Sequence, residues 1–290
     1  MPNVRALDAT DLAALLPAPE APAILQSALL QLAGEGVGGL TWSADATRLP
    51  GLGPKAPDGS AALLSGGAPR LFVERRAFEA HRGATIAGLA AQRLADPRSE
   101  VLTLLGCNAT GRAVFEVVRA VFPDLERVLC FDPDVHRQAQ FADEIMTTFN
   151  VASIIPPEPR EACEGAQILV GCPDPLPKQP VVEFDWIQRG TLVVMLHGAS
   201  AFTDSMLQRA DRRVVDDLGG WRQAAAAGRL AGVPAPEGDL AALVAGRLPP
   251  RSGSPVIATV CFGSPALDAA LAAALLARAD QAGRGRTLAL

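Results

Sequence analysis

Residues 101–118 read VLTLLGCNATGRAVFEVV, and this stretch decides how the rest of the chain is interpreted. Its first five residues form the short apolar run that a buried strand needs. Helical spacing of apolar residues begins near Thr110, so a tight turn lies between the two elements. Gly106 permits such a turn, and Gly111 lets the helix pack closely on the strand. The order of strand, glycine turn and helix predicts a dinucleotide-binding unit.

The glycine pattern of this turn is G-x-N-x-x-G, where the complete motif has G-x-G-x-x-G. Asn108 stands where the backbone approaches the pyrophosphate most closely. Asn adopts left-handed backbone conformations more readily than most residues, although it carries a Cβ atom. We expect the first helical amides, at Ala109 and Thr110, to face the pyrophosphate. The alternative is a plain strand–turn–helix that binds nothing there.

Asp132 ends the next apolar run, in the sequence VLCFDPD. A carboxylate at this place accepts both ribose hydroxyls of NAD and repels the 2′-phosphate of NADP. The alternative role is a helix cap, since Asp132 and Asp134 both precede the next helix. Asp134 is the better-placed cap, which leaves Asp132 free for the ribose. The sequence therefore favours NAD(H) over NADP(H).

Apolar runs alternate with helical patterns through the middle of the chain. Alternation of this kind produces right-handed βαβ units and a parallel sheet. It predicts an α/β protein with a Rossmann-like parallel sheet from about Val101 to Asp217. We expect strands at 101–105, 127–131, 151–155, 167–171, 191–196 and 212–215, with helices at 110–121 and 134–149.

The two ends of the chain have a different pattern. Residues 35–67 are rich in Gly, Pro, Ser and Ala and predict weak strands at best. The helix at 78–94 carries small residues on one face, which allows close packing at a helix pair or an interface. We expect helices at 8–16, 21–34, 78–94, 239–245 and 265–279, and strands at 70–73 and 256–261.

Composition excludes several classes of protein. The net charge is −5 and no basic stripe is present, which argues against a nucleic-acid partner. The five cysteines are scattered without metal spacing, so we expect no metal site and reduced thiols in the cytoplasm. The first residues do not form a signal peptide. Residues 266–279 are too short and too polar to span a membrane.

On these segments, the chain resembles the ornithine cyclodeaminase/mu-crystallin family of NAD(P)-dependent proteins. The similarity extends from about Phe78 to Leu276 and depends on the order of its motifs. The motifs are AHRGATIAGLAAQRL (80–94), SEVLTLLGCNATGRAVFEVV (99–118), FDPDVHRQAQFADEI (131–145), RGTLVVMLHGAS (189–200), QRADRRVVDD (208–217) and LVAGRLPPRSGSPVIATVCFGSPALDAALAAALL (243–276).

The resemblance implies two domains. Residues 1–96 with 264–290 correspond to a smaller α+β substrate and dimerisation domain, and residues 97–263 to the Rossmann domain. It also implies a homodimer that uses NAD(H) or NADP(H) on small amino or imino acids. Arg82 matches the family's carboxylate-binding arginine, whose guanidinium is a bidentate fork. Cys172 lies in the loop that contacts the nicotinamide ribose in the family.

His197 follows a strongly apolar predicted strand, at the edge where ligands bind in open α/β sheets. A histidine there can exchange a proton while hydride moves. The alternative is a buried histidine bonded to the backbone. Cys172 as a nucleophile is a remote alternative, since no base accompanies it in the sequence. Asp216 and Asp217, which also end a predicted strand, are read as helix caps.

Two departures from the family pattern bear on the chemistry. The family's upstream lysine has no counterpart, since Lys55 stands too close to Arg82 to be assigned that role. Ser200 replaces the acid/base aspartate of the cyclodeaminases. We therefore expect an NAD(P)-dependent oxidoreductase of amino or imino acids. The alternatives are a catalytically altered or non-catalytic member that binds a nucleotide or metabolite, and a cyclodeaminase-type lyase with an internal NAD redox cycle.

Overall fold

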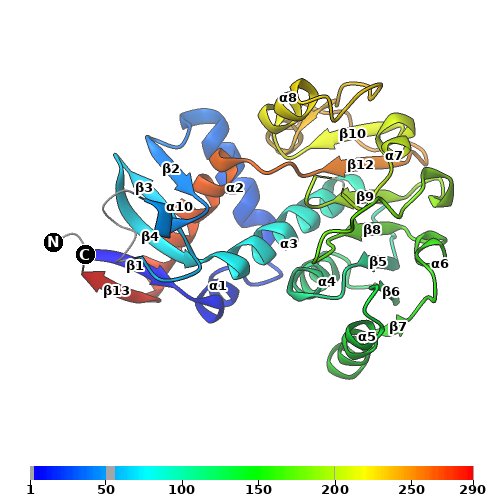
Figure 1. The fold of residues 1–290 in the computed structure, drawn as a ribbon, viewed down its shortest axis with the longest axis horizontal. Helices are drawn as coiled ribbons and strands as arrows, with labels where there is room; N and C mark the ends of the chain where they lie inside the picture. Colours follow the sequence, from blue (N-terminus) through cyan, green and yellow to red (C-terminus); the bar gives the residue numbers. More distant parts are fainter. Residues whose placement is uncertain (1–2, 50–55, 199, 290) are drawn as a thin grey trace.

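The computed structural model describes residues 3–49, 56–198 and 200–289. Its strands form two sheets, which lie at opposite ends of the molecule in Figure 1. The long helix α3 (Arg75–Leu94) runs between them. The mixed α/β architecture that the sequence predicts is therefore confirmed.

The larger sheet has eight strands, and every pair of neighbours in it is parallel. Its central strands are wholly buried apolar runs, as expected where helices cover both faces. The spatial order is β11 (Gly238–Asp239), β10 (Arg212–Val215), β12 (Ile257–Val260), β9 (Leu192–Met195), β8 (Ile168–Gly171), β5 (Val101–Leu105), β6 (Arg127–Phe131) and β7 (Ala152–Ile154).

Helices cover both faces of this sheet and close two apolar cores. One core is shared by α3, α4 (Ala109–Val121), α5 (Val135–Phe149) and α9 (Leu240–Val244). The other lies under α6 (Pro159–Cys163), α7 (Asp204–Arg209) and α8 (Leu218–Ala226). The chain leaves β7 and returns to β8 on the other side of β5. The β5–β8 boundary is the switch point where open α/β sheets bind ligands.

The smaller sheet has the order β13 (Arg286–Ala289), β1 (Asn3–Leu7), β4 (Ala68–Glu74), β3 (Ser60–Ser65) and β2 (Leu40–Ser43). Helices α1 (Ala9–Leu15) and α10 (Pro265–Ala282) share an apolar core with it, and α2 (Ala21–Glu35) packs on α10 and α3. Both ends of the described chain lie in this sheet, where β1 and β13 pair antiparallel (Figure 1).

Several strands of the smaller sheet differ from the sequence-based expectation. The segment 35–67 holds β2 and the well-buried β3, although its Ser and Ala residues have low strand propensity. Pairing with β4 and burial of Leu63 stabilise β3 in place of propensity. Strands β1 and β13 were not expected either, because each is short and its partner lies at the other end of the chain.

The small-residue face of α3 packs on α4 inside the chain. A Cβ atom built on Gly88 would lie 2.2 Å from Cγ1 of Val117, so the helices touch where the glycine stands. Ala84, Ala87 and Ala91 are buried in the same core. The close packing expected for this helix therefore serves a helix pair within one chain. Among the described helices, none is long and apolar enough to cross a bilayer.

Candidate functional site

The turn between β5 and α4 requires glycine at two positions. Gly106 has φ +128°, and a Cβ atom there would lie 2.3 Å from the carbonyl oxygen of Cys172. A Cβ atom on Gly111 would lie 2.2 Å from the carbonyl oxygen of Gly106. Contacts this short do not occur in folded proteins, so both glycines are steric requirements of the switch point, as the sequence motif predicts.

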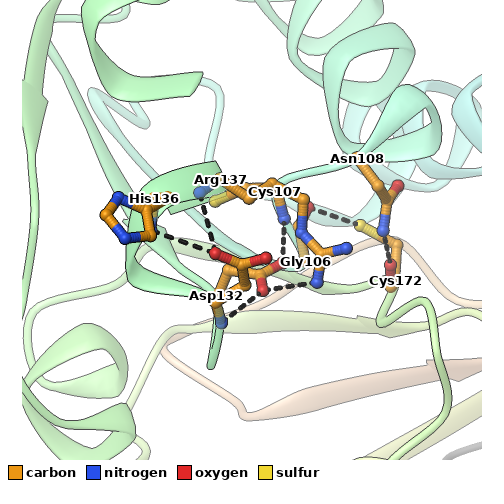
Figure 2. A network of polar contacts seen from close by, with 8 residues as sticks. Gly106, Cys107, Asn108, Asp132, His136, Arg137 and Cys172 are labelled. Atoms are coloured by element: carbon orange, nitrogen blue, oxygen red, sulfur yellow. Dashed lines mark hydrogen bonds and ion pairs between the residues drawn. The ribbon is translucent and has the colours of Figure 1, made fainter. Parts of the chain in front are cut away.

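Asn108 has a different structural role from the middle glycine of the complete G-x-G-x-x-G motif. Its backbone is extended, with φ −133°, so the position needs no glycine conformation. The side-chain oxygen accepts from the amide of Gly111 at 3.1 Å and caps α4. The side-chain nitrogen donates to the carbonyl oxygen of Cys172 at 2.7 Å. Asn108 therefore ties the glycine turn to the end of β8 across the crevice (Figure 2).

The amides of Ala109 and Thr110 begin the 13-residue helix α4. Neither donates a hydrogen bond within the described part of the chain. Two free amides at the positive end of a helix, beside glycines that clear the approach, suit a pyrophosphate. The residues of this crevice thus fit the dinucleotide that the motif predicts.

Asp132 directly follows β6 and is buried under the glycine turn. Its carboxylate accepts from the amides of Cys107 and Asp134, each at 2.9 Å, and pairs with the guanidinium of Arg137 at 2.6 Å (Figure 2). The expectation of a free carboxylate is therefore wrong, because these three donors occupy it. Asp134 caps α5 by accepting from the amides of His136 and Arg137, as predicted.

Cys172 follows β8 and is fully buried. Its thiol lies 3.5 Å from the carbonyl oxygen of Gly106 (Figure 2). Burial raises the pKa of this thiol to about 12, so the thiolate that a nucleophile needs does not form near neutral pH. Cys172 contributes its backbone oxygen to the turn, and the structure argues against the nucleophile.

This assignment predicts a mild phenotype for Cys172→Ala. The variant keeps the carbonyl oxygen that Asn108 binds, so the turn retains its geometry. We expect turnover within about threefold of the parent, with a loss of stability of about 1 kcal/mol for the small cavity. Steady-state kinetics and thermal melts check this. Complete loss of turnover in a folded variant would contradict this assignment and would support a reactive role for the Cys172 thiol.

A cavity of about 110 Å³ lies beside the crevice formed by the glycine turn. The carboxyl ends of β9, β10 and β12 form one side, and α3 forms the other. The polar and titratable residues that line it are Glu79, Arg82, Thr110, His197 and Asp216. Thr110 belongs to the first turn of α4, so the cavity begins where the dinucleotide crevice ends. The two residues that the sequence singled out for catalysis, Arg82 and His197, meet here.

Arg82 reaches this cavity from α3. Its Nη1 donates to both carboxylate oxygens of Asp268 on α10, at 3.0 and 2.8 Å. Its Nε is buried and has no hydrogen-bond partner among the described residues. Burial raises the pKa of Asp268, although the charge of Arg82 opposes the shift. The guanidinium is therefore held in place by one acidic partner while part of its fork stays unpaired.

His197 lies in the turn after β9. Its φ is +62°, a left-handed conformation that few residues other than glycine adopt. Such strain is typical of positions whose side chain is aimed for a function. His197 is exposed at the cavity rim, yet burial of its ring and then the charge of Arg82 lower its pKa. The imidazole is therefore neutral at pH 7, and the alternative of a buried structural histidine does not describe it.

Two acidic residues that line the cavity, Asp216 and Glu79, were not predicted from the sequence as site residues. Asp217 caps α8, as predicted, by accepting from the amide of Gly219. Asp216 instead accepts from the amides of Phe262 and Gly263 at 3.0 and 2.8 Å, and it lines the cavity. Burial raises its pKa. Glu79, one helical turn before Arg82, is the second; its i, i+3 spacing was the available signal.

The remaining sequence candidates lie elsewhere. Lys55 is outside the described residues. Ser200 is half-buried, and its hydroxyl has no hydrogen-bond partner among the described residues. No group of three or more His, Cys, Asp or Glu side chains in the described ranges is arranged to hold a metal ion.

Solved structures of similar fold cover nearly all of this chain. An archaeal alanine dehydrogenase dimer with bound NAD matches with a TM-score of 0.78, 20% identity and full coverage of both chains. The Δ1-pyrroline-2-carboxylate reductase of Thermococcus litoralis, in complex with NADH and L-proline, matches at 0.76 and 20% identity, covering 98% of this chain and 100% of that one. The iminosuccinate reductase of Paracoccus denitrificans, in complex with NAD⁺, matches at 0.72 and 17% identity over both full chains.

One curated relative and a family model add sequence similarity. The N-((2S)-2-amino-2-carboxyethyl)-L-glutamate dehydrogenase of Staphylococcus aureus is 26% identical over 156 residues, which are 53% of this chain and 45% of that protein. The chain thus aligns with less than half of that relative's length. The model of the ornithine cyclodeaminase/mu-crystallin family matches residues 62–258. With its fold and its glycine turn, the chain belongs to the ornithine cyclodeaminase/mu-crystallin family.

Proposed function

We propose that this protein is an NAD(P)-dependent oxidoreductase that interconverts a small amino acid and its imino acid. The observation that carries the proposal is the junction at Thr110. The helix turn that suits the pyrophosphate also forms a wall of the cavity that holds Arg82 and His197. A dinucleotide bound at the switch point would end at this cavity. The oxidoreductase names of the similar proteins support the same chemistry.

The residues of the crevice fit a nicotinamide dinucleotide. The free amides of Ala109 and Thr110 would bind the pyrophosphate, and Gly106 and Gly111 clear its approach. Asp132 would face the adenosine ribose, and the acceptor site that its three donors leave free supports a modest preference for NAD(H) over NADP(H). The backbone after Cys172 would border the nicotinamide ribose. When bound, the nicotinamide supplies or accepts the hydride.

The chain's own residues would orient the substrate and move its proton. Arg82 would hold the substrate carboxylate with the part of its fork that Asp268 leaves free. Glu79 and Asp216 place two carboxyl groups in the cavity, whose oxygens would accept hydrogen bonds from an amine or protonated imine beside that carboxylate. His197 at the rim would accept a proton during amino-acid oxidation and return it during imine reduction.

The two alternatives receive less support. A cyclodeaminase-type lyase needs an acid/base group at Ser200, and a hydroxyl does not titrate near neutral pH. A non-catalytic member would have no use for a strained histidine that faces an arginine in a cavity. Neither alternative is carried by an observation of its own.

We also propose that the protein is a homodimer in the cytoplasm. The similar archaeal alanine dehydrogenase is a dimer. A groove of about 340 Å³ between α2, β2 and α10 is lined mostly with small and apolar side chains, among them Leu32, Val37 and Ala273, and also by Gln31 and Arg70. The five cysteines are free and buried, which suits a reducing compartment. Light scattering tests the dimer, and a mass of one chain would contradict it.

Calorimetric titration of the nucleotide-free protein with NADH and NADPH tests the proposed function first. The protein is then assayed for NADH oxidation with Δ1-pyrroline-2-carboxylate, iminosuccinate, and pyruvate plus ammonia. We expect binding of NADH and turnover of at least one imino acid. Binding without turnover would favour the non-catalytic alternative, and absence of binding would contradict the proposal.

The pH dependence of amino-acid oxidation should follow the charge of His197. Its pKa is lowered, so the neutral form that accepts a proton is lost only as pH falls below the ordinary value of 6.5. We therefore expect kcat/KM for the best amino-acid substrate to fall in that acidic range and to be flat above it. His197→Asn, which tolerates the left-handed backbone, should remove the inflection. An inflection above 6.5 in the parent would count against this role.

A further inference from the structure

We propose that Arg137 sets the cofactor discrimination of this site. By pairing with Asp132, it cancels the negative charge that would exclude a 2′-phosphate. The site then accepts NADP(H) as well as NAD(H), with only a modest preference for NAD(H). This inference rests on the proposed function, because it concerns the ribose end of the same dinucleotide crevice.

Asp132 has little hydrogen-bond acceptor capacity left for a ribose. A carboxylate offers about four lone-pair sites. The amide of Cys107 takes one on Oδ2, and the amide of Asp134 and Arg137 Nη2 take two on Oδ1. About one site is left for a ribose diol that brings two hydroxyl donors. Asp132 therefore recognises the NAD ribose incompletely unless Arg137 moves away.

Of the two charges in this ion pair, the positive charge of Arg137 faces outward. The side chain of Asp132 is 1% exposed, whereas that of Arg137 is 34% exposed. Figure 2 shows the guanidinium beside the carboxylate, next to the turn formed by Gly106 and Cys107. A phosphate that approaches the ribose site meets the cation of this pair first. The repulsion by which a lone carboxylate excludes NADP is thereby neutralised.

Arg137 also lines a surface cavity and carries a hydrogen-bond donor without a partner among the described residues. A surface cavity of about 330 Å³ is lined by Cys107, Asn108, Arg112, Arg137 and Glu144, directly beside the turn. Nε of Arg137 is buried and has no hydrogen-bond partner among the described residues. An unpaired buried donor is unfavourable, so an anion in this cavity would stabilise the guanidinium by accepting from its remaining donors while Nη2 stays on Asp132. The planar fork suits a phosphate.

Arg112 lines the same cavity but is already neutralised. It pairs with Glu116 at 2.7 Å and with Glu144. It is therefore a matched comparison for Arg137, since both cations line one cavity and only Arg137 contacts Asp132. A difference between variants of these two residues would assign the discrimination between NADH and NADPH to Arg137 rather than to the overall electrostatic potential of the cavity.

The experiment is titration of the full-length parent, Arg137→Gln and Arg112→Gln with NADH and with NADPH, at one salt concentration. In the parent we expect the two dissociation constants to lie within about tenfold of each other. Arg137→Gln should weaken NADPH by about tenfold or more while NADH changes by less than about threefold. Arg112→Gln leaves Glu116 and Glu144 without their cation in the same cavity, and it should shift the ratio by no more than about threefold.

A double variant keeps the inference testable if Arg137→Gln alone is unstable. Asp132→Asn with Arg137→Gln removes both charges of the pair, and it should recover most of the NADPH affinity lost in the single variant. A parent that prefers NADH by about 100-fold or more would overturn the inference, as would equal weakening of both cofactors. An equal shift in Arg112→Gln would overturn the assignment to Arg137. If the parent binds neither cofactor, the proposed function itself fails.

Discussion

Replacing Gly106 by alanine is expected to weaken cofactor binding by about 100-fold. The new Cβ atom would lie 2.3 Å from the carbonyl oxygen and 2.7 Å from the carbonyl carbon of Cys172, so backbone has to move. The turn and the end of β8 would separate, which misaligns the amides of Ala109 and Thr110. Loss of two hydrogen bonds to a charged group, worth about 3 kcal/mol together, corresponds to about 100-fold in affinity.

Stability should fall as well, by about 3 kcal/mol, because strain and a backbone clash coincide. Gly165→Ala is the matched control. Gly165 also has a positive φ, +86°, but a Cβ atom there would have nothing within 4 Å. We expect about 1 kcal/mol of destabilisation and unchanged NADH affinity. Calorimetry and urea unfolding measure both quantities. Normal NADH affinity in Gly106→Ala would show that the pyrophosphate does not bind at this turn.

Replacing Arg82 by glutamine is expected to have the largest effect on turnover. The substitution removes the fork proposed to hold the substrate carboxylate and leaves Asp268 buried without its cation. We expect kcat/KM for the imino acid to fall about 100-fold or more, because misplacement of a substrate by about 1 Å already costs that much. NADH affinity should hardly change, since Arg82 lies outside the crevice. Arg82→Lys should not restore turnover, because an ammonium lacks the fork.

The same substitution also breaks a buried ion pair, which costs about 3 kcal/mol. The double variant Arg82→Gln with Asp268→Asn separates the two effects. Removing the stranded carboxylate should recover stability but not turnover. Thermal melts and steady-state kinetics on the two variants make the comparison. Recovery of turnover together with stability would mean that Arg82 has only a structural part.

The parallel sheet and its glycine turn were predictable because their signals are local. Five consecutive apolar or β-branched residues at 101–105 have no stable place but a buried strand. Gly106 and Gly111 follow at the spacing that a strand–turn–helix requires. Asp134 could be assigned as a cap because capping depends on the next two or three residues. Each of these interactions joins residues only a few positions apart, so a short window of sequence is enough to predict it.

The rest of the site depends on contacts between distant segments. Asp216 binds the amides of Phe262 and Gly263, which no pattern around residue 216 indicates. Asp268 meets Arg82 only because the first turn of α10 comes within hydrogen-bond distance of α3. The pairing of Asp132 with Arg137 is close in sequence, yet spacing alone does not tell whether a side chain turns toward the strand end or to solvent. These features required the tertiary fold.

The antiparallel pair of β1 and β13 has a consequence for the order of folding. Asn3 lies opposite Ala289, so the two strands can meet only after nearly all of these residues have been synthesised. The larger sheet needs nothing beyond Val260. During translation the larger sheet can therefore form first. The edge of β1 that pairs with β13 stays unpaired until that last strand is made. A nascent chain that has emerged from the ribosome up to Val260 can form the larger sheet beside a smaller sheet that still lacks its last strand.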